Sequence, residues 1–160
     1  MRTTGNGNHT GECTRLPGAN DAVQVEPLIV IAEEQPAIRE LLRWVLHLEG
    51  YRMMGCVDRQ AALTWGEQTM IPADLQVMLL LDLSPLCAQE AADFLGRVRA
   101  RWQAFCRVLP QIIVLTTHPN VQAYLDSWEC MLLKPFRVRD LLALIRRAME
   151  VTSLAEGSLA

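Results

Sequence analysis

Short apolar runs alternate along the chain with longer segments in which apolar residues recur at helical spacing. Apolar runs without polar alternation are typical of strands that are covered on both faces of a parallel sheet. The candidate strands are residues 27–32, 51–57, 76–82, 111–115 and 130–133. The sequence therefore predicts five strands, each followed by a connection with helical character.

The connections carry their own helix signals. Pro36 opens a helix that Gly50 stops, and Asp58 is a suitable cap for a short helix through Trp65. Further helices are predicted at about 89–105, 121–128 and 138–151. Strands that alternate with helices imply right-handed crossovers. The predicted fold class is α/β, a flavodoxin-like doubly wound five-stranded parallel sheet of order 2-1-3-4-5 with helices on both faces.

Composition limits the number of domains and the class of partner. A chain of 160 residues with 51% hydrophobic residues suits one well-buried domain. We place that domain at residues 26–152, with a flexible N-terminal tail at 1–25 and a C-terminal tail at 153–160. The net charge of −3 provides no basic surface for a phosphate backbone, so direct nucleic-acid binding is not expected.

The cysteines and the apolar runs bear on localisation. Five cysteines without close pairs favour reduced, buried thiols and argue against a zinc site. The N-terminus lacks the apolar core of a signal peptide, and the apolar runs are far shorter than a membrane span. We therefore expect a soluble, cytoplasmic protein with no membrane partner.

Polar residues that can bind a metal ion or take part in a reaction end four of the strands. In chain order, the first, third, fourth and fifth strands end on Glu33 and Glu34, Asp82, Thr116, and Lys134. Because parallel strands point the same way, these groups gather at one edge of the sheet. Three crowded carboxylates repel one another unless a cation lies between them, and Mg²⁺ suits their oxygen ligands.

This combination of groups fits phosphoryl transfer. A carboxylate beside Mg²⁺ can attack phosphorus, while the metal and the lysine neutralise the phosphoryl oxygens. Simpler roles compete with this one: Asp82 could cap a turn, the two glutamates could favour the positive end of the next helix, and Lys134 could be a solvated loop residue. An acid that closes an uninterrupted apolar strand favours the functional interpretation.

Four stretches carry a resemblance to a known family. They are the acidic pair and its following helix in residues 31–42, the strand at 79–82, the strand at 113–116, and the run Leu133-Lys134-Pro135-Phe136. Taken in this order and context, they make residues 27–151 resemble the receiver domain of two-component response regulators, in particular the chemotaxis-regulator type. The resemblance covers nearly all of the chain except its two tails.

The resemblance implies one residue that accepts phosphate and four that hold a metal ion. Asp82 would be phosphorylated by a histidine kinase or a phosphotransfer protein. The Mg²⁺ ligands would be Glu33, Glu34, Asp82 and the backbone carbonyl of Ser84. The chain departs from the family here, because the acidic pair is usually aspartate and Pro85 stands one position closer to Asp82 than in the usual pattern.

The resemblance also implies a switch. Thr116 would be the switch hydroxyl, and Lys134, aimed by a cis Lys134–Pro135 bond, would pair with the phosphoryl group. Thr116 and Lys134 are 18 positions apart (134 − 116), about one helical turn less than in the family. Met131 replaces the aromatic residue that the family usually has on the last strand.

Three functions stay open at this point. The first is a stand-alone receiver in which phosphorylation of Asp82 changes binding to a downstream effector protein. The second is a degenerate receiver that binds partners without phosphorylation. The third, a small hydrolase or nucleotide-binding domain, lacks a glycine-rich phosphate loop or a nucleophile–base pair. In the first two the chain is no enzyme, beyond assisting its own phosphorylation and dephosphorylation, and a homodimer stays open.

Overall fold

The computed structural model describes residues 27–56, 58–68, 71–72, 75–105, 110–127 and 129–156. The predicted N-terminal tail at 1–25 lies outside these residues, as do residues 157–160. The elements in chain order are β1 (Leu28–Ala32), α1 (Pro36–Leu48), β2 (Arg52–Cys56), α2 (Arg59–Gln68), β3 (Val77–Asp82), α3 (Ala88–Phe105), β4 (Gln111–Thr116), the 3₁₀ helix η1 (Pro119–Tyr124), β5 (Cys130–Leu133) and α4 (Val138–Glu156).

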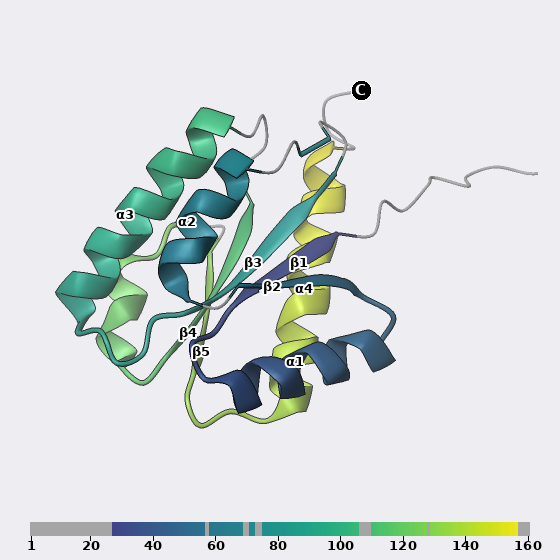
Figure 1. Cartoon of the computed structure of the whole chain (residues 1–160), viewed down its shortest axis with the longest axis horizontal. Helices are drawn as coiled ribbons and strands as arrows, with labels where there is room; N and C mark the ends of the chain where they lie inside the picture. The colour runs from purple at the N-terminus through teal and green to yellow at the C-terminus, as the bar shows by residue number, and fades with distance from the viewer. Residues whose placement is uncertain are drawn as a thin grey trace, which may run out of the picture.

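All five strands form one parallel sheet (Figure 1) in the order β2-β1-β3-β4-β5. The predicted fold class and strand order are therefore confirmed. In the register of the sheet, Asp82 lies beside Leu115, and Thr116 lies beside Leu133. The carboxyl ends of β3, β4 and β5 consequently reach the same edge, where ligands of open parallel sheets bind.

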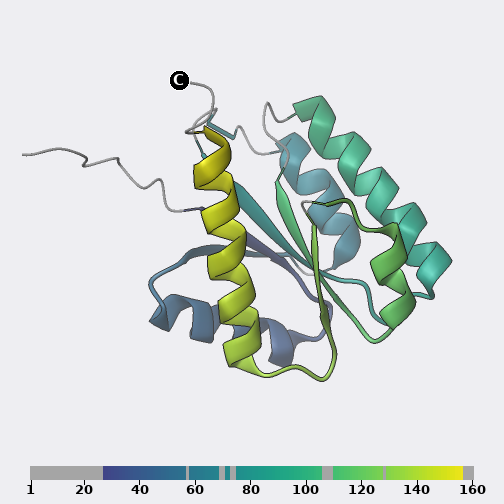
Figure 2. The same ribbon diagram turned by 180° about the vertical axis from the view of Figure 1, so that it is seen from behind.

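Helices cover both faces of the sheet (Figures 1 and 2), with α2 and α3 on one face and α1 and α4 on the other. The central strand β3 serves both layers. Leu79 and Leu81 pack against α2 and α3, whereas Met78 and Leu80 pack towards α1 and α4. Successive side chains of a strand point to opposite faces, so a strand buried on both faces has no polar alternation.

The helix ends follow the local sequence signals. Pro36 is in the first turn of α1, and Gly50 after its last turn has φ of 86°, the left-handed conformation that glycine allows. The Asp58 carboxylate accepts the Ala61 N–H at 2.6 Å, which confirms Asp58 as the cap of α2. α2 ends at Gln68, between Gly66 and Pro72.

The connection between β4 and β5 differs from the prediction. We expected a helix over residues 121–128, but the segment forms the 3₁₀ helix η1, which begins at Pro119 and ends at Tyr124. Only 13 residues (129 − 116) join the two strands, close to the minimum for a parallel crossover, so little room remains for an α-helix and its two loops. α4 is longer than expected and reaches Glu156.

The described cysteines differ in burial more than predicted. Cys56 is buried, and burial raises the pKa of its thiol to about 11, with the nearby Asp58 carboxylate adding to the effect. Cys130 is partly buried, and Cys87 is exposed at the start of α3, so the prediction of buried thiols is wrong for Cys87. In the described part of the chain, none of the helices combines the length and the apolar character that crossing a membrane requires.

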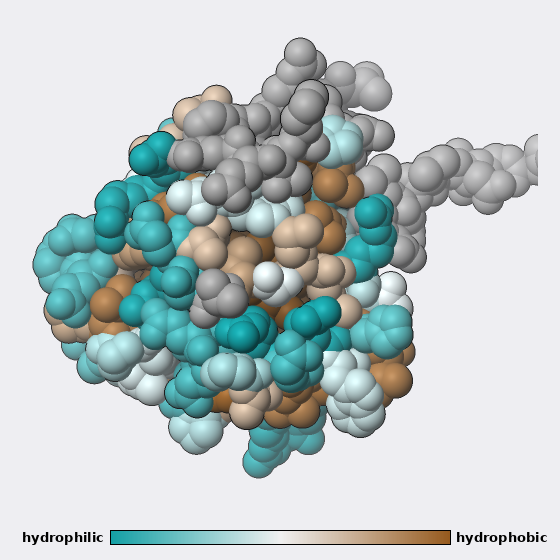
Figure 3. All heavy atoms as spheres, in the orientation of Figure 1, coloured by the Kyte–Doolittle hydropathy of each residue, from teal (hydrophilic) through white to brown (hydrophobic). Residues whose placement is uncertain are grey.

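Hydrophilic and hydrophobic residues are distributed unequally over the surface (Figure 3). The outer side of α3 is mostly hydrophilic, whereas hydrophobic residues are visible over α1, where Leu41, Trp44 and Leu48 are exposed. Inside, the rings of Trp65 and Trp102 stack at 5.6 Å between α2 and α3. Trp65 and Trp102 therefore hold α2 and α3 together, whereas Trp44 on α1 is exposed.

Candidate functional site

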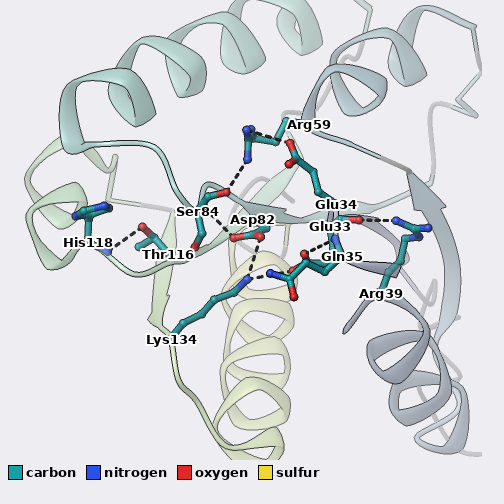
Figure 4. Close-up of polar contacts among 10 residues, drawn as sticks. All are labelled: Glu33, Glu34, Gln35, Arg39, Arg59, Asp82, Ser84, Thr116, His118 and Lys134. Carbon is teal, nitrogen blue, oxygen red and sulfur yellow. Dashed lines mark hydrogen bonds and ion pairs between the residues drawn. The ribbon is translucent and has the colours of Figure 1, made fainter. Parts of the chain in front are cut away.

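Four strands deliver the predicted side chains to one edge of the sheet (Figure 4). Glu33 follows β1, Asp82 ends β3, Thr116 ends β4, and Lys134 follows β5. The Lys134 N–H donates to the Thr116 carbonyl at 2.8 Å, so the sheet continues one residue beyond β5. The gathering of these residues is thus a consequence of parallel strand direction and register, as the sequence predicted.

Asp82 is the centre of the group. Its residue is only 3% exposed, although a carboxylate is costly to remove from water without partners. Its two oxygens have separate partners: Oδ1 accepts the Ser84 N–H at 2.9 Å, and Oδ2 lies 2.9 Å from Lys134 Nζ. The carboxylate is therefore held in one orientation, with one oxygen facing an ammonium group.

Lys134 bridges two buried carboxylates. Its Nζ lies 3.1 Å from Glu33 Oε2 as well as 2.9 Å from Asp82 Oδ2. The other oxygen of Glu33, a fully buried residue, accepts the Gln35 N–H at 2.9 Å. Lys134 is also the one lysine of the sequence, and the other 14 of its 15 lysine and arginine residues are arginine. A compact ammonium fits between two carboxylates where a planar guanidinium would need more room.

Glu34 points away from this cluster (Figure 4). Its side chain is 46% exposed, and its Oε1 lies 3.0 Å from Arg59 Nη2. The same guanidinium donates from Nη1 to the Ser84 carbonyl oxygen at 2.8 Å. Arg59 thus joins two groups that the resemblance implied as metal ligands.

Sequence reasoning missed Arg59. One signal was present, because Asp58 was recognised as a helix cap and the next residue must then begin the helix. The sequence could not show that the start of α2 lies against the turn after β3. That proximity joins residues 25 positions apart (84 − 59) and depends on the packing of α2 on the sheet.

Thr116 is fully buried beside the cluster. Its Oγ1 accepts the His118 N–H at 3.1 Å, which fixes the hydroxyl at the turn after β4. A hydroxyl that accepts one bond still has its own hydrogen to donate. The Ser84 Oγ is a second hydroxyl at this edge, and it is buried without a hydrogen-bond partner among the described residues.

The predicted Mg²⁺ ligands are divided between two side-chain cations. Glu33 and Asp82 share Lys134, whereas Glu34 and the Ser84 carbonyl share the guanidinium of α2. Among the described residues, no three histidine, cysteine or acidic side chains are arranged to hold a metal ion. In this arrangement two side-chain cations bond to the four expected ligands in pairs, so Mg²⁺ would have to displace a side-chain cation to reach them.

A cleft opens beside the guanidinium, between the start of α2 and the N-terminal half of α3. It is lined in part by Glu34, Arg59, Glu90 and Arg97. Glu90 Oε2 accepts the N–H of Cys87 at 2.9 Å, and this bond lowers the pKa of the Glu90 carboxyl. The cleft leaves the exposed side of Glu34 accessible from outside the protein.

A separate ion-pair cluster holds the short connection after β4. Arg99 of α3 bonds to the buried Glu129 carboxylate, lies 3.1 Å from Asp126 Oδ2, and donates to the Tyr124 carbonyl at 3.0 Å. The hydrogen bond to Glu129 raises the pKa of Arg99. η1 and the start of β5 are therefore tied to α3, a contact that the sequence analysis did not foresee.

Comparison with known proteins adds a fold assignment. No family model and no curated protein matches the chain. Among solved structures, a response regulator from Thermotoga maritima is 16% identical, with a TM-score of 0.58 over 78% of this chain and 98% of that one. The receiver domain of a sensor histidine kinase from Pseudomonas aeruginosa, with magnesium in its active-site cleft, is 21% identical, with a TM-score of 0.55 over 78% and 98%.

A third similar structure is the response regulator TrrA of Thermotoga maritima in complex with Mg²⁺ and BeF. It is 21% identical to this chain, with a TM-score of 0.56 over 76% of this chain and 98% of that one. The similarity at these identities concerns the fold. The chain has the fold of response regulator receiver domains, and the resemblance read from its motifs is confirmed at that level.

Proposed function

We propose that the chain is a receiver of two-component signalling that accepts a phosphoryl group on Asp82. The observation that carries the proposal is the position of this carboxylate. It ends the central strand of a receiver fold, is almost completely buried, and has the Lys134 ammonium 2.9 Å from one oxygen. A carboxylate in this setting is a suitable nucleophile towards phosphorus.

In the proposed reaction, one Asp82 oxygen attacks the phosphorus of a phosphohistidine or of a small acyl phosphate. The new P–O bond forms as the bond to the leaving group breaks, and the leaving nitrogen or oxygen keeps the electron pair. Lys134 Nζ, held in place by Glu33, would form an ion pair with the phosphoryl oxygens as negative charge develops on them. The hydroxyls of Thr116 and Ser84 are further donors at this edge.

The signal would leave the site through the β4–η1 connection. A phosphoryl group adds roughly −1.5 to −2 charges at neutral pH, and here it would appear next to Thr116. Reorienting the Thr116 hydroxyl would break its bond with His118 and change the surface around η1 and β5. A histidine kinase or phosphotransfer protein is the proposed donor of the phosphoryl group. The proposed downstream partner is an effector protein that binds the changed surface. The stand-alone, cytoplasmic and non-enzymatic character and a homodimer stay predictions.

A second candidate is a degenerate receiver that binds partners without phosphorylation. It is favoured by the two side-chain cations, since Lys134 and Arg59 already neutralise most of the acidic charge without a bound ligand. Mg²⁺ binding would require Glu34 and the Ser84 carbonyl to exchange the guanidinium for a metal ion. The test of the first candidate is therefore run both with and without Mg²⁺.

The test is incubation of the full chain with acetyl phosphate, followed by intact-mass analysis. We expect addition of one phosphoryl group that is stable in acid and lost in base, and that Asp82→Asn abolishes. Asp93→Asn is the matched control, because Asp93 is an exposed carboxylate on α3 near the same edge.

A second readout uses the single lysine. Labelling with ¹⁵N-lysine gives one amide signal, that of Lys134, whose N–H bonds to the Thr116 carbonyl. The signal should shift when the donor is added to the wild type and stay unchanged in Asp82→Asn. Absence of mass addition with saturating donor, with and without Mg²⁺, would reject phosphorylation and favour the degenerate receiver.

A further inference from the structure

Arg59 is placed by the fold at the edge of the site. It is the first residue of α2, directly after the capping residue Asp58, and its side chain is only 16% exposed. Figure 4 shows its guanidinium and the Lys134 ammonium approaching the Asp82–Ser84 segment from opposite sides. The position is thus fixed by helix packing and does not depend on a freely moving surface side chain.

The two acceptors of this guanidinium are of the kind that hard cations prefer. One is the Glu34 carboxylate at 3.0 Å, and the other is the Ser84 carbonyl oxygen at 2.8 Å. Carboxylate and carbonyl oxygens are typical ligands of divalent cations in proteins. Both are occupied here by N–H donors from one planar group.

We propose that the Arg59 guanidinium takes the place of a divalent cation in this site. It neutralises Glu34, holds the turn after Asp82 through the Ser84 carbonyl, and excludes Mg²⁺ by occupying these two oxygen donors. The exclusion of metal does not depend on phosphorylation. Its consequence for signalling, phosphoryl transfer to Asp82 without a metal ion, rests on the function proposed above.

The charge balance supports this assignment. Glu33, Glu34 and Asp82 supply three negative charges, and Lys134 and Arg59 supply two positive ones within 3.1 Å of them. A divalent ion that entered beside an undisplaced guanidinium would face like charge at close range in a partly buried setting. The ion could bind only after the guanidinium left both acceptors, so the two cations compete for one position.

The closing experiment measures metal binding directly. MnCl₂ is titrated into the wild-type full chain and into Arg59→Met, with free Mn²⁺ followed by electron paramagnetic resonance. MgCl₂ is tested by the rise of the unfolding temperature that a ligand of the native state produces. We expect no saturable site in the wild type at millimolar metal. Arg59→Met should gain a saturable site, because a competing positive charge is gone. Its affinity for Mn²⁺ should be at least about tenfold higher than that of the wild type.

Arg97→Met is the matched control. Arg97 lines the same cleft and lies 5.0 Å from the centre of the Phe94 ring, so its removal changes the net charge equally without freeing Glu34 or the Ser84 carbonyl. This control should behave as the wild type does. Gain of the metal site in Arg59→Met alone would support the proposal, and equal gain in both variants would overturn it.

Two other results would also overturn the proposal. One is saturable Mn²⁺ binding by the wild type that Glu34→Gln removes, a measurement that does not need Arg59→Met to fold. The other is a folded Arg59→Met without any gain in metal affinity. Phosphorylation of the wild type that requires Mg²⁺ would overturn metal replacement while leaving Asp82 as acceptor. Conversely, absence of phosphorylation together with the expected metal titrations would reject only the proposed function.

Discussion

The acidic site has two halves that are built differently. In the lysine half (Glu33, Asp82, Thr116 and Lys134), two carboxylates that are almost completely buried share one ammonium. In the arginine half (Glu34, Arg59 and Ser84), a half-exposed carboxylate and a backbone carbonyl share one guanidinium. Each half has its own cation, and Asp82 lies between them, bonded to Lys134 on one side and to the Ser84 N–H on the other.

The difference in burial separates a fixed half from an exchangeable one. A buried carboxylate that loses its partner cannot regain water easily, so the lysine half has to remain paired. Glu34 can turn to solvent through the cleft, so loss of its partner costs less. The lysine half is therefore suited to permanent positioning of the acceptor, and the arginine half is where one cation could replace another.

The largest effect is expected from Lys134→Met. The change leaves Glu33 and Asp82 buried together without a positive partner, and removal of one member of a buried ion pair typically costs about 3 kcal/mol of unfolding free energy. Urea unfolding monitored by circular dichroism measures this loss. Arg139→Met, which removes an exposed cation from α4, is the control and should change stability little. A loss for Lys134→Met no greater than for this control would contradict the assignment of a fixed half.

Arg59→Met should destabilise the chain less than Lys134→Met does. It removes one charged hydrogen bond to the Ser84 carbonyl and one ion pair with a carboxylate that water can solvate. After allowance for solvent screening at Glu34, we expect a loss of about 1.5 kcal/mol by the same urea measurement. If Arg59→Met lowered the unfolding free energy as much as Lys134→Met does, the arginine half would be as firmly fixed as the lysine half, which would contradict the distinction between them.

Thr116→Val tests the lysine half without changing charge. Valine nearly keeps the shape of threonine but cannot accept the His118 N–H, so a loss of about 1 kcal/mol is expected in urea unfolding. Thr116→Ser retains the acceptor but removes the buried methyl group, so the difference between threonine and valine measures the hydroxyl and the serine variant measures the methyl. With the donor present, the valine variant should still add a phosphoryl group but show a smaller shift of the Lys134 amide.

The smallest effect is expected at Glu90, beside the arginine half. Its carboxyl pKa is lowered by the bond from the Cys87 N–H, so this stabilisation is present above the ordinary glutamate pKa and disappears as pH falls through the lowered value. Glu90→Gln should therefore slightly lower the unfolding temperature at neutral pH, and the difference should vanish in acid. A difference that persisted unchanged at low pH would show that the carboxylate charge is not its source.

The gathering of the acidic and basic residues followed from local sequence. Asp82 ends an apolar run with no polar interruption, and the parallel direction of the strands then brings Glu33, Thr116 and Lys134 to it. The fold and the lysine half could be predicted because they depend on strand order and strand direction, two properties that the alternation of strands and helices already contains.

The partners of Glu34 and Ser84 could not be predicted in this way. They meet Arg59 because α2 packs on the sheet with its first turn against the turn after β3, and no local pattern encodes that distance. The 3₁₀ helix after β4 is a similar case. Its form depends on the room left by a short crossover and on Arg99 reaching the Glu129 carboxylate from α3.

By itself, the sequence determined the five strands, the four α-helices, the strand order in the sheet and the acid at the end of the central strand, because these follow from periodicity, strand direction and chain connectivity. Only the tertiary structure decided which cation each carboxylate faces. That choice depends on ångström-scale distances between side chains from different elements, with Lys134 between Glu33 and Asp82 and Arg59 between Glu34 and Ser84.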